Sequence, residues 1–286
     1  MKQALLTLFL SFIIPFSVFA QWLKNSGSPF ITNYTPQMYE AHPQNWDIEQ
    51  DHRGVLYFSN TSGILEFDGT NWNLKELPHK KTCRRMARDR NGKIYVASSG
   101  EIGYIKPDKR GKITYHSLNN LISDKDKPFY DIFDIFLIKD TLYFRTRKKI
   151  FVYHSDTVHR YSIGNKSEST EITASFAYNK KPYLYIKEKG IYHLNNGVLK
   201  KTIDNSAFGN RHIESILQIN KSAFLTNIDN SLYTIHFNKS GDKFEIKKFK
   251  TSNDHFFKKN KIYEGLLRYE DYIVIGTSMG GIAILD

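Results

Sequence analysis

The sequence is poor in cysteine, in paired histidines and in nucleotide-binding glycine motifs. Cys83 is the single cysteine in 286 residues, which excludes an intramolecular disulfide and a multi-cysteine zinc site. The ten histidines are scattered without a His-x-x-x-His pair, and neither a Gly-x-Ser-x-Gly elbow nor a phosphate-binding loop occurs. We therefore expect no metal, no cofactor and no catalytic residue.

The composition is that of a globular, β-rich chain. Hydrophobic residues make up 40% and charged residues 24%, which argues against both a disordered chain and a protein with many membrane spans. Eighteen Tyr and twenty Phe stand against 17 Gly and 8 Pro. Aromatic side chains suit the pleated, half-buried surface of a sheet, so this balance favours β structure.

The N-terminal residues 1–20 have the pattern of a signal peptide. Lys2 supplies the positive charge, an apolar stretch runs to Phe16, and Val18-Phe19-Ala20 precedes the expected cleavage point. The apolar stretch is short for a membrane span and contains Pro15. Gln21, and not a cysteine, stands directly after the cleavage point, so we expect no lipoprotein anchor. We expect an exported, periplasmic protein.

The chain is strongly basic, with a formal net charge of +12 that falls to +11 when Lys2 is removed. The dense part of this charge comprises Lys80, Lys81, Arg84, Arg85, Arg88 and Arg90. Its spacing is closer to a period of two than to 3.6, which excludes a basic helix. Solvated strand and loop charge is one interpretation, and attraction to an acidic ligand or envelope polymer is another. We expect no nucleic acid partner, because an exported chain rarely meets one.

A repeat of about forty residues organises the rest of the chain. A short alternating strand, a polar loop and a second strand recur six times. Corresponding apolar residues in the six copies are Leu56, Ile94, Leu142, Leu184, Phe224 and Ile273, at intervals of 38, 48, 42, 40 and 49 residues. This period matches one four-stranded blade of a β-propeller.

The turns between these strands support the same fold class. Asp68-Gly69, Asn91-Gly92 and Asn196-Gly197 lie where tight hairpins need positive φ angles. For the first blade we predict strands over 46–50, 56–60, 64–67 and 72–77. The sequence thus predicts an all-β propeller over residues 45–286, with six repeats and an incomplete last blade. Residues 21–44 form an N-terminal segment in which Pro29 to Tyr34 is expected to pair as an edge strand.

Three segments resemble the two-component-regulator propeller sensors of bacteria. Residues 44–51, running into Gly54-x-Leu56-Tyr57-Phe58 and 63–69, look like the opening blade of that family. Residues 83–86 are similar to its inner-strand pattern, and Ile275-Gly276-Thr277 with Gly280-Gly281-Ile282 is similar to its Gly-Thr, Gly-Gly-Leu signature. The resemblance covers about residues 22–286.

The resemblance implies a periplasmic sensor module that takes part in signal transduction and transcription regulation. In the family, such propellers precede a triple-tyrosine domain, a membrane helix, and a histidine kinase or DNA-binding output. This sequence stops at Asp286 in the middle of a blade. We therefore expect an N-terminal fragment of a longer sensor or a truncated paralogue, with any kinase activity outside this chain. Its unpaired edge over 262–286 favours self-association, including a homodimer.

An enzyme is the alternative, and the residues give it little support. Asp51 and Gly54 partly imitate the Asp box of sialidases, but Glu49 and Tyr57 stand where that box has Ser and Trp. Glycosidases need two carboxylates facing one bond, and spacing singles out no such pair. Asp51 and Asp89 each precede a turn glycine, so we interpret both as turn caps. We interpret Cys83, at an apolar strand position, as a buried and inert thiol.

Ligand binding by a non-catalytic sensor is the function that remains. Loops leading into the innermost strands of a propeller converge on one face, and aromatic rings with charged groups there suit a sugar. The predicted ligand-binding residues are Asn45, Trp46, Arg84, Arg85, Tyr130, Asp131, Arg211, Glu214, Tyr263 and Glu264. The Arg-rich second repeat beside Trp46 favours an anionic oligosaccharide or other envelope ligand. A polysaccharide lyase or glycosidase and an interaction scaffold remain the alternatives.

Overall fold

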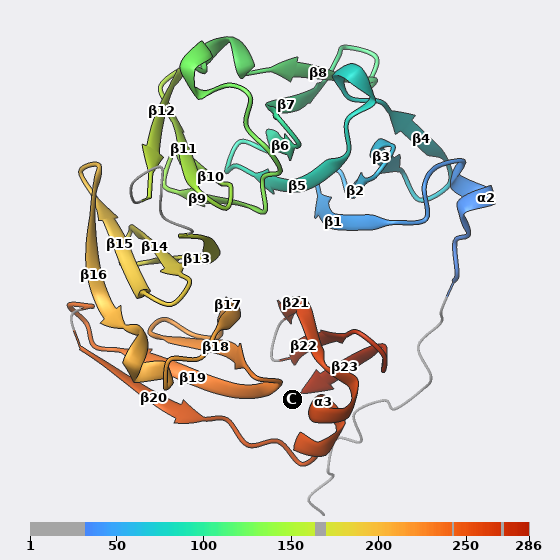
Figure 1. Ribbon diagram of the computed structural model, residues 1–286. Helices are drawn as coiled ribbons and strands as arrows, with labels where there is room; N and C mark the ends of the chain where they lie inside the picture. Colours follow the sequence, from blue (N-terminus) through green and yellow to red (C-terminus); the bar gives the residue numbers. More distant parts are fainter. Residues whose placement is uncertain (1–31, 164–169, 242, 270–271, 286) are drawn as a thin grey trace, which may run out of the picture. The chain divides into compact units, whose positions relative to one another are not determined.

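The computed structural model describes residues 32–163, 170–241, 243–269 and 272–285 (Figure 1). The chain divides into two units, Met1–Tyr34 and Thr35–Asp286. Every helix and strand described below lies in the second unit. The predicted signal peptide, residues 1–20, lies outside the described residues.

The first three blades of the second unit are antiparallel sheets of four strands each, ordered as in the sequence. Their strands are β1 (Asn45–Gln50), β2 (Leu56–Asn60), β3 (Gly63–Phe67) and β4 (Trp72–Lys75) in blade 1, β5 (Cys83–Arg88), β6 (Ile94–Ser98), β7 (Glu101–Pro107) and β8 (Ile113–Ser117) in blade 2, and β9 (Asp134–Ile138), β10 (Thr141–Arg145), β11 (Lys149–His154) and β12 (Thr157–Ser162) in blade 3. The strands predicted for the first blade are confirmed to within a few residues.

The other three blades repeat this plan, and the sixth has three strands within the described ranges. Their strands are β13 (Ile172–Tyr178), β14 (Lys181–Ile186), β15 (Gly190–Asn195) and β16 (Val198–Asp204) in blade 4, β17 (Ile213–Gln218), β18 (Ala223–Ile228), β19 (Ser231–Phe237) and β20 (Phe244–Lys248) in blade 5, and β21 (Ile262–Tyr269), β22 (Tyr272–Thr277) and β23 (Ile282–Leu285) in blade 6. In Figure 1 the six blades follow one another around a ring, and each innermost strand from β1 to β17 touches the innermost strand of the next blade. The predicted all-β propeller fold is confirmed.

The sequence repeat corresponds to the second strand of each blade. All six aligned residues, from Leu56 to Ile273, lie in β2, β6, β10, β14, β18 and β22. Side chains alternate between the two faces of each of these strands, so they pack in turn toward the preceding blade and toward the following one. In β14, Tyr183 and Tyr185 pack toward blade 5, whereas Leu184 packs toward blade 3. The core is therefore a series of layers between consecutive blades.

The layer between blades 4 and 5 shows why the sequence is rich in aromatic residues. Phe176, Tyr178, Tyr183, Phe224 and Phe237 are all buried there. Neighbouring rings lie 4.6 to 6.2 Å apart in stacked, tilted or edge-on pairs. Such pairs contribute about 0.5–1.5 kcal/mol each beyond their buried area. Large flat side chains thus fill the space between twisted sheets.

Helices are short and lie at the ends of blades. Helix α2 (Pro36–Tyr39) places the Tyr39 ring 5.4 Å from that of Trp72, at the outermost strand of blade 1. Helix α3 (Asp254–Asn260) joins blade 5 to blade 6, where the sequence pattern predicts no helix. Thr32 to Thr35 have no regular structure. Pairing of Pro29 to Tyr34 as a strand is thus not seen in the described part, and residues 29–31 lie outside it.

The turn roles inferred for Asp51 and Asp89 are confirmed. Asp51 Oδ1 accepts hydrogen bonds from the backbone N–H groups of Arg53 (2.8 Å) and Val55 (3.1 Å). Asp89 Oδ1 accepts two equivalent bonds in the corresponding turn of blade 2. Both carboxylates therefore stabilise the turns between first and second strands, at the end of the ring opposite to the hollow described below.

Candidate functional site

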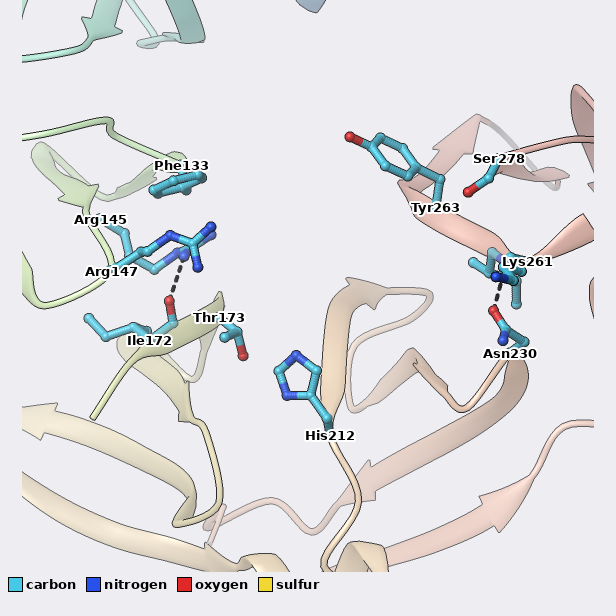
Figure 2. Close-up of a pocket in the computed structure, with 11 residues that line it drawn as sticks. Phe133, Arg145, Arg147, Ile172, Thr173, His212, Asn230, Lys261, Tyr263 and Ser278 are labelled. Atoms are coloured by element: carbon cyan, nitrogen blue, oxygen red, sulfur yellow. Dashed lines mark hydrogen bonds between the residues drawn. The ribbon is translucent and has the colours of Figure 1, made fainter. Parts of the chain in front are cut away.

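One end of the ring carries a polar hollow of about 470 Å³ with walls from blades 3 to 6 (Figure 2). Successive strands of a blade run in opposite directions, so the connections into first strands and the turns between second and third strands lie at the same end. Residues in or next to both kinds of connection line the hollow. They are Phe133, Arg145, Arg147, Ile172, Thr173, His212, Asn230, Lys261, Ile262, Tyr263 and Ser278.

On one side of the hollow, Arg145 is a structural residue. Its guanidinium is buried and donates to Ser175 Oγ and to the Ile172 carbonyl oxygen, at 2.9 Å each. Asp134 Oδ2 lies 4.0 Å from Arg145 Nε. These contacts join blade 3 to blade 4. Because the guanidinium already has these partners, Arg145 holds the wall of the hollow in place and does not serve as a ligand-binding group.

Arg147, two residues later, is different because its guanidinium faces solvent. It lies in the turn between β10 and β11, with Cζ 4.8 Å from the centre of the Phe133 ring. Its Nη1 donates to Glu171 Oε2 at 3.3 Å, and 57% of the Arg147 side chain is exposed. A flat cation held against an aromatic ring is preorganised for a planar anion.

On the opposite side, blades 5 and 6 supply Asn230, Lys261 and Tyr263 (Figure 2). Asn230 Oδ1 accepts a hydrogen bond of 3.0 Å from the backbone N–H of Ile262, which fixes the start of β21. Lys261 is exposed, and its carbonyl accepts a bond of 2.9 Å from the N–H of Ser278. The Tyr263 ring is 58% exposed and points into the space between the two walls.

The charged side chains that line this hollow are all cationic. Three lining side chains, Arg145, Arg147 and Lys261, are cationic, and His212 adds an imidazole at the base. No Asp or Glu belongs to the lining as formed by the described residues. A hollow with several cations and no carboxylate in its lining attracts small anions.

A second hollow of about 560 Å³ shares Phe133 and Arg147 with the first. Its remaining lining is partly apolar and comprises Pro128, Phe129, Tyr130, Asp131, Thr146, Lys148, Lys149 and Glu171. The Tyr130 ring is 80% exposed. Arg147 therefore stands between a polar cationic hollow and a more apolar one.

Three predicted residues from different blades come together near this end. The Arg84 guanidinium lies 4.0 Å above the Trp46 ring and pairs with Asp131 at 3.2 Å. Arg85 donates to the carbonyl oxygens of Trp46 and Phe133, at 2.9 Å each. Arg84 and Arg85 thus join blades 1, 2 and 3 through contacts within the protein. Their role in binding a ligand stays a prediction.

The other predicted residues are dispersed. Tyr263 lines the first hollow, and Tyr130 and Asp131 line the second. Arg211 lies over the Tyr233 ring at 5.4 Å and faces Asp229 at 3.7 Å, and it lines neither hollow. The side chains of Glu214 and Glu264 lie outside the described part of the structure.

Sequence reasoning missed Arg147, His212, Asn230, Lys261 and Ser278. It considered only the loops that enter first strands at five positions, whereas Arg147, Asn230 and Ser278 lie in turns between second and third strands. These turns reach the same end of a propeller. Aligning them across the six repeats would have placed all three at the end of the ring that carries the hollow.

The described residues offer neither a cluster that could hold a metal ion nor an exposed thiol. In the described ranges, no three His, Cys, Asp or Glu side chains lie close enough together to hold a metal ion. Cys83 is buried between blades 1 and 2, 3.2 Å from Ser59 Oγ, and burial raises its pKa to about 12. The buried position inferred for Cys83 from the sequence is confirmed. No helix in the described ranges has the length and apolar character that a membrane crossing requires.

Comparison with known proteins relates this chain to others by fold. No protein-family model and no curated protein matches it. Virginiamycin B lyase from Staphylococcus aureus is 14% identical, with a TM-score of 0.59 over 84% of this chain and 83% of the lyase. YCF48 from Cyanidioschyzon merolae is 12% identical, with a TM-score of 0.56 over 84% and 94%. At these identities the likeness concerns the fold alone.

The solved structures that match this chain also include the extracellular domain of a hybrid two-component system from B. thetaiotaomicron. It is 15% identical to this chain, with a TM-score of 0.48. The match covers 84% of this chain and 37% of that one.

Proposed function

We propose that this chain is a non-catalytic, ligand-sensing propeller module of a signal-transduction regulator. The ligand is a carbohydrate or another envelope molecule that binds in the hollow lined by Arg147, Lys261 and Tyr263. The observation that carries the proposal is the origin of the lining, which comes from four consecutive blades. A ligand that contacts all four would alter how the blades pack, and packing between blades is what downstream domains can sense.

The sequence supports the proposed function independently of the geometry of the hollow. The segments that resemble propeller sensors fall on first, second and third strands, at β1 to β3, β5, β22 and β23. The N-terminal pattern of residues 1–20 favours export to the periplasm. The expected partners are an oligosaccharide and, in a full-length protein, the membrane-anchored signalling domains that follow such propellers.

A polysaccharide lyase is the second candidate, and His212 with Tyr263 is the observation that favours it. Both line a hollow that also holds Arg147 and Lys261. β-Elimination on a uronate needs a cation that neutralises the carboxylate and a base that removes a proton, and His or Tyr can act as that base. A glycosidase is less suited, because it needs two carboxylates facing one bond.

The proposal is tested by filling the hollow. Ser278 lines it and is exposed, so Ser278→Trp should block ligand binding while leaving the fold intact. Met279→Trp is the matched control, because the next residue of the same turn is 66% exposed and does not line the hollow. Calorimetric titration with neutral and acidic oligosaccharides should show binding to wild type and to Met279→Trp, and none to Ser278→Trp.

Two outcomes would contradict the proposal. Equal binding by both Trp variants would place the ligand elsewhere. Depolymerisation of a glycan, with formation of an unsaturated uronate that absorbs in the ultraviolet, would favour the lyase instead.

A further inference from the structure

The Arg147 backbone is fixed while its guanidinium is exposed. Thr146 Oγ1 accepts hydrogen bonds from the N–H groups of Lys148 (3.2 Å) and Lys149 (2.8 Å), which closes the turn around Arg147. The Arg147 carbonyl oxygen accepts a further bond of 2.7 Å from Ile172 at the start of blade 4. A rigid backbone with a solvated cation loses little conformational freedom when an anion binds.

The anion that Arg147 contacts in this structure comes from the chain itself. Glu171 precedes the first strand of blade 4, and its backbone is fixed by a hydrogen bond of 2.8 Å from Lys187 N–H to its carbonyl oxygen. Its carboxylate accepts one bond of 3.3 Å from Arg147. Among the described residues it is the acidic partner of that guanidinium, which has five N–H donors. A single long bond between two partly exposed groups is easily exchanged.

We propose that Glu171 stands in for the ligand's acidic group as the partner of Arg147, and that a ligand carboxylate or sulfate replaces it there. The inference rests on the proposed function and names the class of ligand, an acidic oligosaccharide. Lys261 on the opposite wall supplies a second cation for the same ligand. Glu171 lines the second hollow and not the first, so Arg147, which lines both, can exchange Glu171 for a ligand in the first hollow.

The exchange would also transmit binding. The pair of Arg147 and Glu171 joins the second-to-third-strand turn of blade 3 to the start of blade 4. When the ligand takes Arg147, that side-chain link between blades is lost, whereas the backbone bond from Ile172 to Arg147 remains. Displacement of Glu171 therefore couples ligand binding to contact between two blades.

The test is a double-mutant cycle on the full chain with trigalacturonate as the probe and galactotriose as its neutral counterpart. Arg147→Gln should weaken trigalacturonate binding about tenfold or more, because a charged hydrogen bond is lost. Glu171→Gln should strengthen it about two- to fivefold, because the competing carboxylate is gone. In the double variant, Glu171→Gln should have no effect.

Two matched variants control for general charge effects. Glu188→Gln removes the same charge from an exposed turn at the same end of the ring, and Arg90→Gln removes a cation from an exposed turn at the other end. Neither should change trigalacturonate binding by more than about twofold at physiological salt. A sulfated disaccharide in parallel titrations distinguishes a sulfate ligand from a uronate, and stronger binding of either supports the proposal.

A second measurement needs no oligosaccharide. Millimolar sodium sulfate should raise the melting temperature of wild type more than that of Arg147→Gln. The melting temperature of Glu171→Gln should rise the most. The comparison between variants removes the general stabilising effect of sulfate.

The proposal is overturned if Glu171→Gln binds acidic probes no more tightly than wild type, or if the effect persists in the double variant. If galactotriose binds tightly to wild type and Ser278→Trp abolishes that binding, the proposed function stands and the inference about Glu171 is wrong. Absence of binding by any glycan would contradict both.

Discussion

Two arginines two positions apart, Arg145 and Arg147, show how burial determines what a guanidinium does. Arg145 is buried and satisfies Ser175, Ile172 and Asp134. Arg147 is exposed and has one carboxylate partner. In the sequence both are basic residues near the end of one strand, and nothing there distinguishes them. The neighbouring blade determines which of the two side chains is buried.

Replacing these two arginines should therefore have unequal effects on stability. Arg145→Met should lower the free energy of unfolding by about 3 kcal/mol, because it leaves buried polar partners unpaired. Arg147→Met should change it by less than about 1 kcal/mol, as expected for an exposed ion pair. Urea denaturation of both variants measures the difference. Similar losses in the two variants would contradict the distinction.

Two aspartates of blade 1 should titrate with opposite effects on stability. Burial raises the pKa of Asp47 above 3.8, despite backbone bonds from Met86 and Ile48. Burial also acts on Asp51, but hydrogen bonds from Arg53 and Val55 outweigh it and lower its pKa. Asp47 therefore contributes stability below pH 3.8 that is lost as the pH rises through its raised pKa. Asp51 contributes stability above pH 3.8 that is lost as the pH falls through its lowered pKa.

Denaturation across this acidic range, on asparagine variants, measures both effects. Asp47→Asn should gain stability relative to wild type as the pH rises through the raised pKa of Asp47. The deficit of Asp51→Asn should shrink as the pH falls below 3.8. Parallel pH profiles for the two variants would show that the two environments do not differ as described.

At the scale of elements, strands and hairpins could be predicted because their signals are local. Alternating apolar residues and Asn-Gly turns need no tertiary partner to be recognised. Helix α3 could not be predicted this way. It has seven residues, too few for a clear period, and it begins where Asn253 Oδ1 accepts a hydrogen bond of 3.2 Å from Phe256 N–H.

The hairpin between β15 and β16 gives a prediction at this scale. Its turn is Asn196-Gly197, with φ angles of 46° and 81°, as a two-residue turn requires. An alanine Cβ at Gly197 would lie 2.9 Å from a ring carbon of Tyr161, whereas at Gly69 (φ 99°) it would meet nothing within 4 Å. Gly197→Ala should cost about 1–2 kcal/mol more than Gly69→Ala in thermal unfolding. Equal costs would mean that Tyr161 moves away freely.

At the scale of the whole molecule, the repeat predicted the ring of blades but not which side chains meet inside it. Trp46, Arg84 and Asp131 were predicted from three separate repeats, and the structure brings them together. Arg211 was predicted by the same reasoning and turns toward Tyr233 instead. A repeat alignment gives the end of the ring at which a residue lies. It does not give the direction of the side chain.

The outer face of β23 leads to a prediction about association. Ile282 and Ile284 are 67% and 61% exposed, whereas Ala283 and Leu285 pack toward blade 5. Exposed branched residues on one face of a strand favour contact with another chain. Ile282→Thr with Ile284→Thr should reduce self-association in sedimentation velocity. Val198→Thr, at a similarly exposed strand residue of blade 4, should not. Unchanged association in the double variant would rule out this face.

Hydrogen–deuterium exchange tests the central claim, that ligands bind at the end of the ring formed by blades 3 to 6. The full chain would be measured with and without saturating trigalacturonate. We predict slower exchange at residues 146–149 and 260–263, where the two walls of the hollow lie. Protection confined to the turns around Asp51 and Asp89, at the opposite end, would contradict the account.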